Sequence, residues 1–403
     1  MQQLSIKLKN NITRIMFILT LLVIGFGSLG GGTYNNYNIS ISFLYFFIFF
    51  ICFYRQEIGK HINRKLFLAI LSMFCLFLIS CLFPTFNNYM DVWGRYYALL
   101  SCVLFAYCTY ILLIKKKVNF LSIIKILAII GFIHVAVLLG TWFSIPHPEH
   151  HNWVNGLFFF PNIRHLVDFL TICFLCALGL FFFQSEKSLE KMIWWLISLV
   201  ILACIFWSGS RAAYIGLLPS VLLLIWHYKK NYLSVAGFVL IFLIALYLPS
   251  FFNVSSKDLG FSQAIHRSTQ GTVEQASTGR FYLYKQVFEW FSYHPIWGNG
   301  AEAMTQMEIY IGGLIVFQAH NSILQILVEF GLMGLLGVLY VFYVVLNDLK
   351  GKKLNDKQFF SLVIIINIMT AALFNGGAYY VVTISLMCLF IAIIYSEEKI
   401  RNE

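Results

Sequence analysis

"ILACIFWSGSRAAYIGLLPSVLLLIWH", residues 201–227, is the stretch that decides the fold. Two apolar runs flank a turn of three small residues, and Arg211 directly after the turn carries the only Asp, Glu, Lys or Arg charge. A helix needs about 20 mostly apolar residues to cross a bilayer. The pattern therefore predicts two membrane spans, over about 192–207 and 212–228, joined by a tight turn.

The composition of the whole chain is that of a membrane protein. Its 403 residues are 60% hydrophobic, 18% aromatic and 11% charged, with a mean hydropathy of +0.79. Soluble domains contain about 45–50% apolar and about 25% charged residues. The alternating pattern of β-barrel strands is not visible, so we expect helices. We predict an all-α polytopic membrane protein.

The apolar runs between charge clusters predict about twelve spans, with boundaries uncertain by several residues. They cover roughly 12–29, 39–54, 66–83, 96–114, 121–143, 166–184, 192–207, 212–228, 232–249, 322–346, 359–374 and 379–395. The first run lacks an A-x-A-like cleavage site, so we interpret it as a retained span and not as a removed signal peptide. The nine cysteines, including the pair Cys173 and Cys176, lie in apolar runs and are interpreted as small hydrophobic residues.

The basic residues orient these spans. With the N-terminus in the cytoplasm, 21 of the 28 Lys and Arg residues fall on cytoplasmic segments, and both termini are expected there. The net charge of +11 is therefore explained by topology and by attraction to anionic lipid, not by nucleic-acid binding. The seven basic residues expected on the outer side are Arg95, Arg164, Arg211, Lys257, Arg267, Arg280 and Lys285.

One outer connection, residues 250–319, is about 70 residues long, and long loops in compact proteins are often functional. We therefore divide the chain into nine spans (1–249), a large outer loop (250–321), and three further spans with a tail (322–403). Within the loop, "STGRFYLYKQVFEWFSYHPIWGNG" (277–300) has apolar residues at helical spacing. It predicts an amphipathic helix over about 280–293 that lies at the membrane–water interface.

Two arginines begin predicted helices on the outer side, each after small polar residues. Arg211 follows "SGS" and Arg280 follows "STG". The N–H groups at the start of a helix favour anions, so both arginines are candidate anion ligands. The alternatives are snorkelling of Arg211 to the lipid headgroups and a solvated loop charge at Arg280.

A histidine precedes the tenth predicted span in "FQAHNSILQILVEFGLMG" (317–334). His320 is a candidate general base, because imidazole titrates near neutral pH, or else a satisfied interfacial histidine. Ser322, Gln325 and Glu329 form a polar stripe on the helix that follows. Glu329 lies about 180° around this helix from His320, so we expect it to hold a neighbouring helix and not to pair with His320.

Two weaker candidates are on the same side. Arg164 in "PNIRHLVDF" can pair with Asp168 four residues later, or contribute a third cation. The "HPEHH" cluster, with His147, His150 and His151, resembles a metal site only superficially, since its spacing does not match H-E-x-x-H. The chain has no P-loop and no G-x-S-x-G motif, which argues against nucleotide binding and serine hydrolysis.

The motifs, in their order, resemble the O-antigen ligase/polymerase superfamily of bacterial inner membranes. They are "SGSRAAYIGLLP" (208–219), "STGRFYLYKQVFEW" (277–290), "HPIWGNG" (294–300) and "HNSILQILVEFGLMGLLG" (320–337). The resemblance covers the C-terminal half. It implies a glycosyltransferase of C-type, many-spanning architecture that acts in the periplasm without a metal or ATP.

The resemblance also implies the substrates and the site. The donor would be a glycan on undecaprenyl diphosphate, and the acceptor a sugar hydroxyl of lipid A–core. Arg211 and Arg280 match the arginines that bind the diphosphate, and His320 matches the catalytic histidine. We add Arg164, Asn321 and Ser210 as candidate supporting residues.

A ligase is favoured over a polymerase. Polymerases of this superfamily often carry R-x₁₀-G repeats in two large loops, whereas this chain has one such loop. The residues eleven positions after Arg211, Arg280, Arg267 and Arg164 are not glycine. A transporter, the alternative from another class, predicts interrupted helices in paired halves, and no clear repeat is visible.

Overall fold

The computed structural model describes residues 2–27, 37–183, 188–229, 232–256, 258–269, 277, 279–311 and 314–402. The regular secondary structure of the described residues is helical apart from two strands of two residues each, which confirms the predicted all-α class. The α-helices are α1 (Gln2–Phe26), α2 (Tyr37–Tyr54), α3 (Arg64–Leu82), α4 (Tyr89–Ile114), α5 (Phe120–Ser144), α6 (Ile163–Phe183), α7 (Ser188–Trp207), α8 (Arg211–His227), α9 (Tyr232–Tyr247), α10 (Phe261–Thr269), α12 (Arg280–Tyr293), α13 (Ser322–Leu349), α14 (Asp356–Asn375) and α15 (Val381–Asn402).

Short elements connect these helices. Strands β1 (Tyr310–Ile311) and β2 (Leu314–Ile315) form an antiparallel pair. The 3₁₀ turns are η1 (Arg55–Glu57), η2 (Pro148–His150), η3 (Leu248–Phe251), η4 (Ala303–Thr305) and η5 (Gly377–Tyr379).

Eleven of the described helices are long and apolar enough to cross a membrane. α8 is apolar but shorter, with 17 residues. Together these twelve helices coincide one to one with the twelve predicted apolar runs. The chain is therefore a multi-pass membrane protein.

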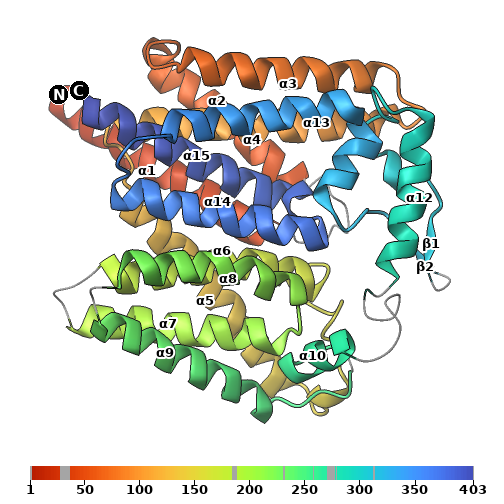
Figure 1. The fold of residues 1–403 in the computed structure, drawn as a ribbon. Coiled ribbons are helices and arrows are strands. Elements are labelled where there is room, and N and C mark those ends of the chain that lie inside the picture. The colour runs from red at the N-terminus through yellow and green to blue at the C-terminus, as the bar shows by residue number, and fades with distance from the viewer. Residues whose placement is uncertain are drawn as a thin grey trace.

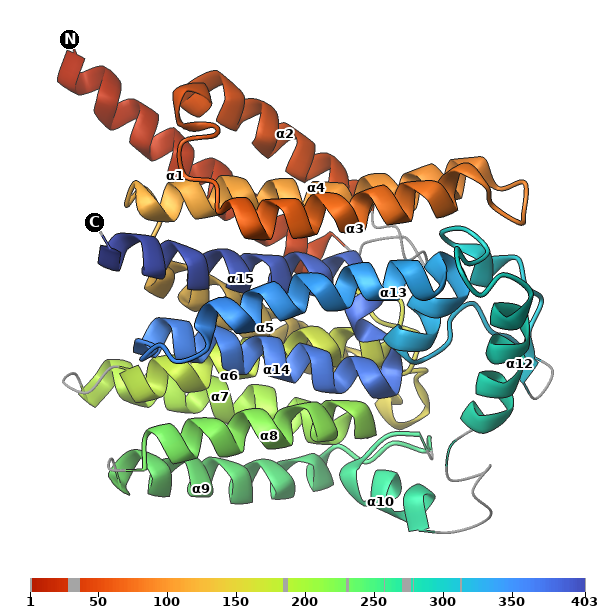
Figure 2. The ribbon, with the colours of Figure 1, turned by 45° about the horizontal axis from the view of Figure 1, so that its top comes forward.

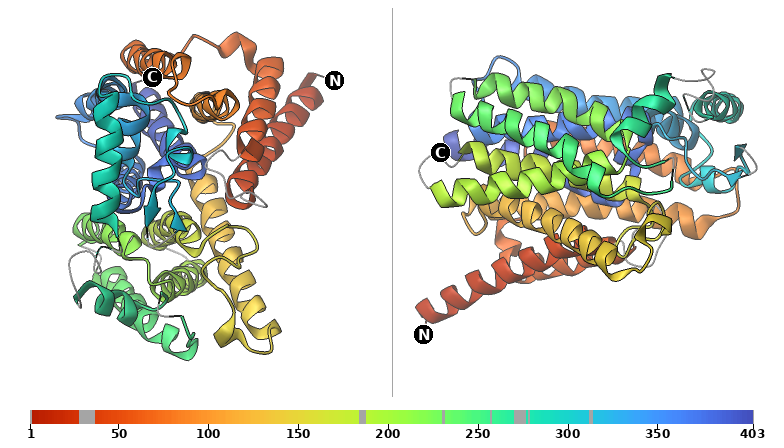
Figure 3. Two further views of the ribbon diagram at one scale, coloured as in Figure 1. Left: turned by 90° about the vertical axis from the view of Figure 1, so that its right-hand side faces the viewer. Right: turned by 90° about the horizontal axis from the view of Figure 1, so that it is seen from below.

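The membrane helices run side by side, with both termini at one end of the bundle (Figure 1). α10, α12 and the hairpin β1–β2 lie at the other end, which we call the loop face. α12 lies across the ends of the bundle helices instead of along them (Figures 1 and 2). Seen onto the loop face, α12 extends along one edge of the bundle (Figure 3).

Burial separates inner from outer helices. α6 is apolar around its whole circumference over residues 172–183, and nearly all of it is buried among α5, α7, α8 and α14. The outer helices α3, α8 and α9 instead expose large apolar side chains such as Leu68, Leu222 and Leu243, each more than half exposed. Such side chains are compatible with lipid as the surrounding solvent.

α13 is interrupted near the loop face at Gly331, whose backbone is not helical (φ 68°, ψ −171°). An interrupted helix leaves backbone donors and acceptors without helical partners. The turn 294–300 supplies partners through four hydrogen bonds. It donates two to α13, from the Asn299 amide to the Val328 carbonyl and from the Gly300 amide to the Glu329 carbonyl, both at 2.9 Å. It accepts the other two, from the Leu332 amide at the Pro295 carbonyl (2.9 Å) and from the Met333 amide at the Ile296 carbonyl (3.1 Å). The motif "HPIWGNG" therefore has a structural role as the partner of this interruption.

One sequence expectation near the loop face is wrong. The fourth span was expected to begin at about residue 96, with Arg95 outside it. α4 begins at Tyr89, and the Arg95 side chain is completely buried in the bundle. Its guanidinium lies over the Tyr379 ring, 3.7 Å from the centroid, and donates a hydrogen bond to the Tyr379 carbonyl. Tyr379, which is distant in the sequence, thus provides the partner that lets an arginine side chain lie inside the helix bundle.

Candidate functional site

The candidate cations lie at the starts of three helices. Arg164 is the second residue of α6, Arg211 the first residue of α8, and Arg280 the first residue of α12. Helix N-termini carry partial positive charge and N–H groups without helical partners, so each position is suited to an anion. His320 comes two residues before α13 begins at Ser322.

Arg164, Arg211 and Arg280 lie in one region, because the charges of Arg164 and Arg211 act on Arg280. Burial is the largest cause that lowers the pKa of Arg280, and the positive charges of Arg164 and Arg211 lower it further, against an opposing effect of Tyr284. The structure therefore brings together three arginines that the sequence placed apart, Arg164 and Arg211 at the starts of spans and Arg280 in the outer loop. A region with so much positive charge stabilises a bound anion.

Arg280 connects α12 to the end of α14. Gly279, in the left-handed conformation (φ 78°), turns the chain into α12. The Arg280 guanidinium then donates a hydrogen bond to the backbone carbonyl of Phe374. α12 extends from Arg280 to Tyr293, the bounds predicted from the sequence, and buries Leu283 and Val287.

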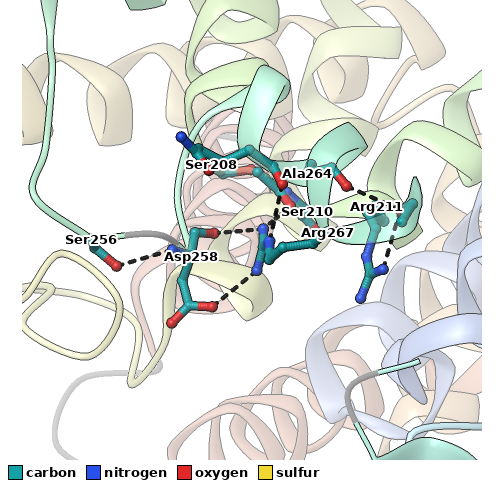
Figure 4. Close-up of polar contacts among 10 residues, drawn as sticks. Ser208, Ser210, Arg211, Ser256, Asp258, Ala264 and Arg267 are labelled. Carbon is teal, nitrogen blue, oxygen red and sulfur yellow. Dashed lines mark hydrogen bonds and ion pairs between the residues drawn. The ribbon is translucent and has the colours of Figure 1, made fainter. Parts of the chain in front are cut away.

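Arg211 follows a turn that packs against the chain leading into α10. Gly209 has a left-handed backbone (φ 65°), and a Cβ atom there would lie 2.8 Å from the Asp258 carbonyl oxygen. The Nη1 atom of Arg211 donates to Oγ of Ser268 in α10, at 3.2 Å (Figure 4). Ser210, a candidate supporting residue, is buried at the N-cap position of α8.

Arg267 is a cation of this region that the sequence did not assign to the site. It donates to Oδ1 and to the backbone carbonyl of Asp258, both at 2.9 Å, and to the Gly209 carbonyl at 3.4 Å (Figure 4). Arg267 thereby fastens α10 to the turn before α8, and its charge is balanced by Asp258. No spacing in the sequence connects Arg267 to Arg211, so only the folded chain reveals this contact.

Asp168 has a partner other than the one expected. Among the ion pairs of the described residues, none joins Arg164 to Asp168, and the Asp168 carboxylate accepts a hydrogen bond from the Asn375 side chain at the end of α14. The Asn375 side-chain oxygen accepts from the Gly377 amide at 2.8 Å. Asp168 therefore stabilises the junction between α14 and η5, beside the segment that carries His320.

Contacts from α6 and from Tyr380, the residue between η5 and α15, reach the segment before His320. The His165 ring lies edge to face on the Tyr380 ring, with centroids 4.2 Å apart. The Tyr380 hydroxyl donates to Oε1 of Gln318 at 2.7 Å. The start of α6, the start of α15 and residue 318 are thus held together.

The backbone of His320 is held on both sides. His320 itself has a left-handed backbone (φ 49°), an uncommon conformation for a residue with a side chain. The preceding amide, of Ala319, donates to Oε1 of Gln325 at 2.8 Å. On the other side, Oδ1 of Asn321 caps α13 by accepting from the amides of Ile323 (2.9 Å) and Leu324 (3.1 Å).

Asn321 also anchors this segment to α14, because its Nδ2 donates to the Leu373 carbonyl at 3.0 Å. Gly376 (φ 70°) passes close by, and a Cβ atom there would lie 3.5 Å from the Cα of His320. His320 is thereby fixed in space relative to the ends of α14 and α13.

His320 is held neutral in the free protein. Burial, followed by the charges of Arg280, Arg164 and His165, lowers the pKa of His320 to about 3, although hydrogen bonding to the backbone of Asn375 opposes the shift. A neutral imidazole can accept a proton, as a general base must. Glu329 does not approach His320; its carboxylate accepts hydrogen bonds from Gln325 (2.6 Å) and from the Tyr379 hydroxyl, as expected for a residue that holds a neighbouring element.

The histidines of the "HPEHH" segment are not arranged as a metal site. His147, Glu149 and His150 are exposed, with His147 Nδ1 3.3 Å and His150 Nε2 3.8 Å from the same Glu149 oxygen. Within the described ranges, no three His, Cys, Asp or Glu side chains lie together in a way that could hold a metal ion.

The fold and site together define a multi-pass membrane protein with a cationic region and a neutral histidine on one face. Residues 196–339 match the model of a family described as O-antigen ligase, and this range includes Arg211, Arg280 and His320. The match supports the resemblance that the motifs indicated, to the O-antigen ligase/polymerase superfamily, whose members transfer glycans. The comparison with curated proteins gives no match.

Proposed function

We propose that this chain is an O-antigen ligase. It transfers a glycan from undecaprenyl diphosphate to a sugar hydroxyl of lipid A–core, in the biosynthesis of lipopolysaccharide. The observation that carries the proposal is the convergence of Arg164 and Arg280 on the neutral His320, with Arg211 close enough to act on Arg280, at the loop face of the bundle.

The arginines would bind the donor diphosphate. In this reaction the bond between the sugar and the diphosphate breaks, and negative charge develops on the leaving phosphate. Guanidinium groups stabilise such charge well, because they are planar, permanently charged and able to donate two parallel hydrogen bonds. Among the described residues no carboxylate forms an ion pair with Arg164 or Arg280, although the more distant charges of Asp258 and Asp168 act on Arg164.

His320 would act as the general base. The acceptor hydroxyl oxygen forms the new bond to the anomeric carbon, its proton passes to His320, and the electron pair of the broken bond leaves with the diphosphate. Direct displacement of this kind inverts the anomeric centre. The charge of the bound diphosphate offsets that of Arg280 and Arg164, which raises the pKa of His320 toward the range of an effective base.

The proposed location follows from the same reaction. The chain lies in the bacterial inner membrane, with the loop face in the periplasm and both termini in the cytoplasm. The partners are the lipid-linked glycan, the lipid A–core acceptor and membrane lipids. Neither a metal nor another cofactor takes part.

Lipopolysaccharide from a deletion strain tests this function. Loss of O-antigen from the core, with accumulation of long lipid-linked polymer, is the expected result, and complementation with the wild-type gene should reverse it. Core that carries a single repeat unit would instead identify a polymerase of the same superfamily. Unchanged lipopolysaccharide would exclude both.

A further inference from the structure

A buried polar cluster lies behind His320 and has no part in the proposed chemistry. Its members come from three elements that are distant in sequence: Arg95 in α4, Gln325 and Glu329 in α13, and Tyr379 in η5. All four are at least 95% buried. Charged groups inside a membrane protein are costly and are usually retained for a role.

The Glu329 carboxylate is the centre of the cluster. Its Oε1 accepts from Nε2 of Gln325 at 2.6 Å, and its Oε2 accepts from the Tyr379 hydroxyl. The backbone amide of Glu302, in the turn before η4, also donates to this carboxylate. One carboxylate therefore joins α13, η5 and the turn of the outer loop.

Gln325 links Glu329 to the backbone just before His320. Its Oε1 accepts from the Ala319 amide at 2.8 Å, while its Nε2 donates to Glu329. The orientation of the amide is determined by its partners, because a backbone N–H needs an acceptor and a carboxylate needs a donor. The Ala319 amide and Glu329 therefore both favour the same orientation of the Gln325 amide.

Arg95 supplies the balancing charge. Its guanidinium donates to the Tyr379 carbonyl and lies over the Tyr379 ring, and the nearby carboxylates are those of Glu302 and Glu329. Removal of one charge from a buried pair leaves the other uncompensated. Arg95 thus places a positive charge in the same buried cluster as the carboxyl groups of Glu302 and Glu329.

We infer that Glu329, balanced by Arg95, is a positioning residue that holds His320 in its left-handed backbone conformation through Gln325 and Ala319. The inference rests on the proposed function, in which His320 is the base. A general base must lie within hydrogen-bond reach of the proton that it removes. A shift of about 1 Å at such a group costs about 10²-fold in rate.

Two variants test the inference in the purified full-length protein in lipid nanodiscs. Glu329→Gln removes the charge, and Gln325→Met removes the amide without any change of charge. Ser361→Ala is the matched control, because Ser361 is also fully buried and hydrogen-bonded, but in α14 far from His320, to the Lys357 carbonyl. Two quantities are measured: kcat and KM for glycan transfer, and the rate at which diethyl pyrocarbonate modifies His320, with the exposed His147 as internal reference.

We expect kcat to fall about 10- to 100-fold in both variants with little change in KM for the donor. We also expect the His320 modification rate to change severalfold relative to His147, and the control to resemble the wild type. An unchanged His320 modification rate in Gln325→Met, which retains every charge, overturns the inference whatever happens to kcat. If His320→Ala is fully active, while the His320 modification rate still changes in Glu329→Gln and Gln325→Met, the proposed role of His320 as the base fails. The positioning of His320 by Glu329 then still stands.

Discussion

Gly298 and Gly331 meet through bare backbone: a Cβ atom on Gly331 would lie 2.6 Å from the amide nitrogen of Gly298. Both residues are in the left-handed region, with φ 75° and 68°. The contact joins the turn after α12 to the interruption of α13, and α13 is the helix that His320 precedes.

Gly298→Ala should therefore destabilise the protein more than its backbone conformation alone requires. A left-handed alanine costs roughly 1–2 kcal/mol, and a clash with the backbone of Glu329 and Gly331 should bring the total to about 2–4 kcal/mol. Gly351→Ala is the matched control, since Gly351 has a similar φ of 74° but no heavy atom within 4 Å of the position that a Cβ atom would take. Denaturant unfolding of the two variants in detergent measures the difference, and equal destabilisation would contradict the close contact.

Arg211→Ala and Arg280→Ala should each lower kcat for glycan transfer by about 10²–10³-fold, because each removes a donor aimed at developing charge. Arg280→Lys should recover only part of the loss, since an ammonium cannot donate two parallel hydrogen bonds. Lys285→Ala, on the exposed side of the same helix α12, is the control and should have normal activity. Wild-type activity in an arginine variant that reaches normal membrane levels would remove that arginine from the site.

His320 should make the free protein less stable in acid. Its pKa of about 3 in the folded state lies below the ordinary value of about 6.5. As the pH falls from 6.5 toward 3, the unfolded chain gains a proton at this residue and the folded chain does not, so stability is lost across that window. His320→Gln should therefore lose less stability than the wild type between pH 7.5 and 5.

The measurement is the thermal unfolding midpoint at both pH values, with His147→Gln in the exposed cluster as the control. Added inorganic diphosphate should reduce the difference between wild type and His320→Gln, because the anion offsets the neighbouring arginines. Identical acid sensitivity of wild type and His320→Gln would refute the lowered pKa.

Asn321→Ala should cost about 1 kcal/mol of stability through loss of the helix cap. Asn321→Asp keeps the acceptor that caps Ile323 and Leu324, but loses the Nδ2 donor to Leu373. The aspartate variant should thus recover most of the stability, aided by its charge at a helix N-terminus. Equal unfolding free energies for the alanine and aspartate variants would argue against the cap.

Hydrophobic runs and local stop signals were enough to predict much of the fold. Each apolar run is a strong signal because it must reach across a bilayer, and α12 ends at Tyr293 before a His–Pro pair that cannot continue a helix. The polar stripe on α13 likewise indicated that Glu329 holds another element.

Features that depend on distant partners were not predictable. A buried arginine requires an aromatic or anionic partner, and the partner of Arg95, Tyr379, is 284 positions away in the sequence. Because this partner could not be recognised, Arg95 was placed outside its span. The interruption at Gly331 depends on the turn at Gly298, and the role of Arg267 depends on Asp258 and Gly209. None of these contacts leaves a periodic pattern in the sequence, and the motif "HPIWGNG" does not by itself indicate its partner in α13.

The distribution of the candidate site over the starts of different helices has a consequence for biogenesis. Arg164 and Arg211 leave the ribosome well before His320, and the anchors of His320 at Leu373 and Gly376 follow later still. A chain whose last helices have not yet inserted holds cations but no fixed base. Under the proposed function, glycan transfer would become possible only at the end of membrane assembly, so that unfinished enzyme would not consume the lipid-linked donor.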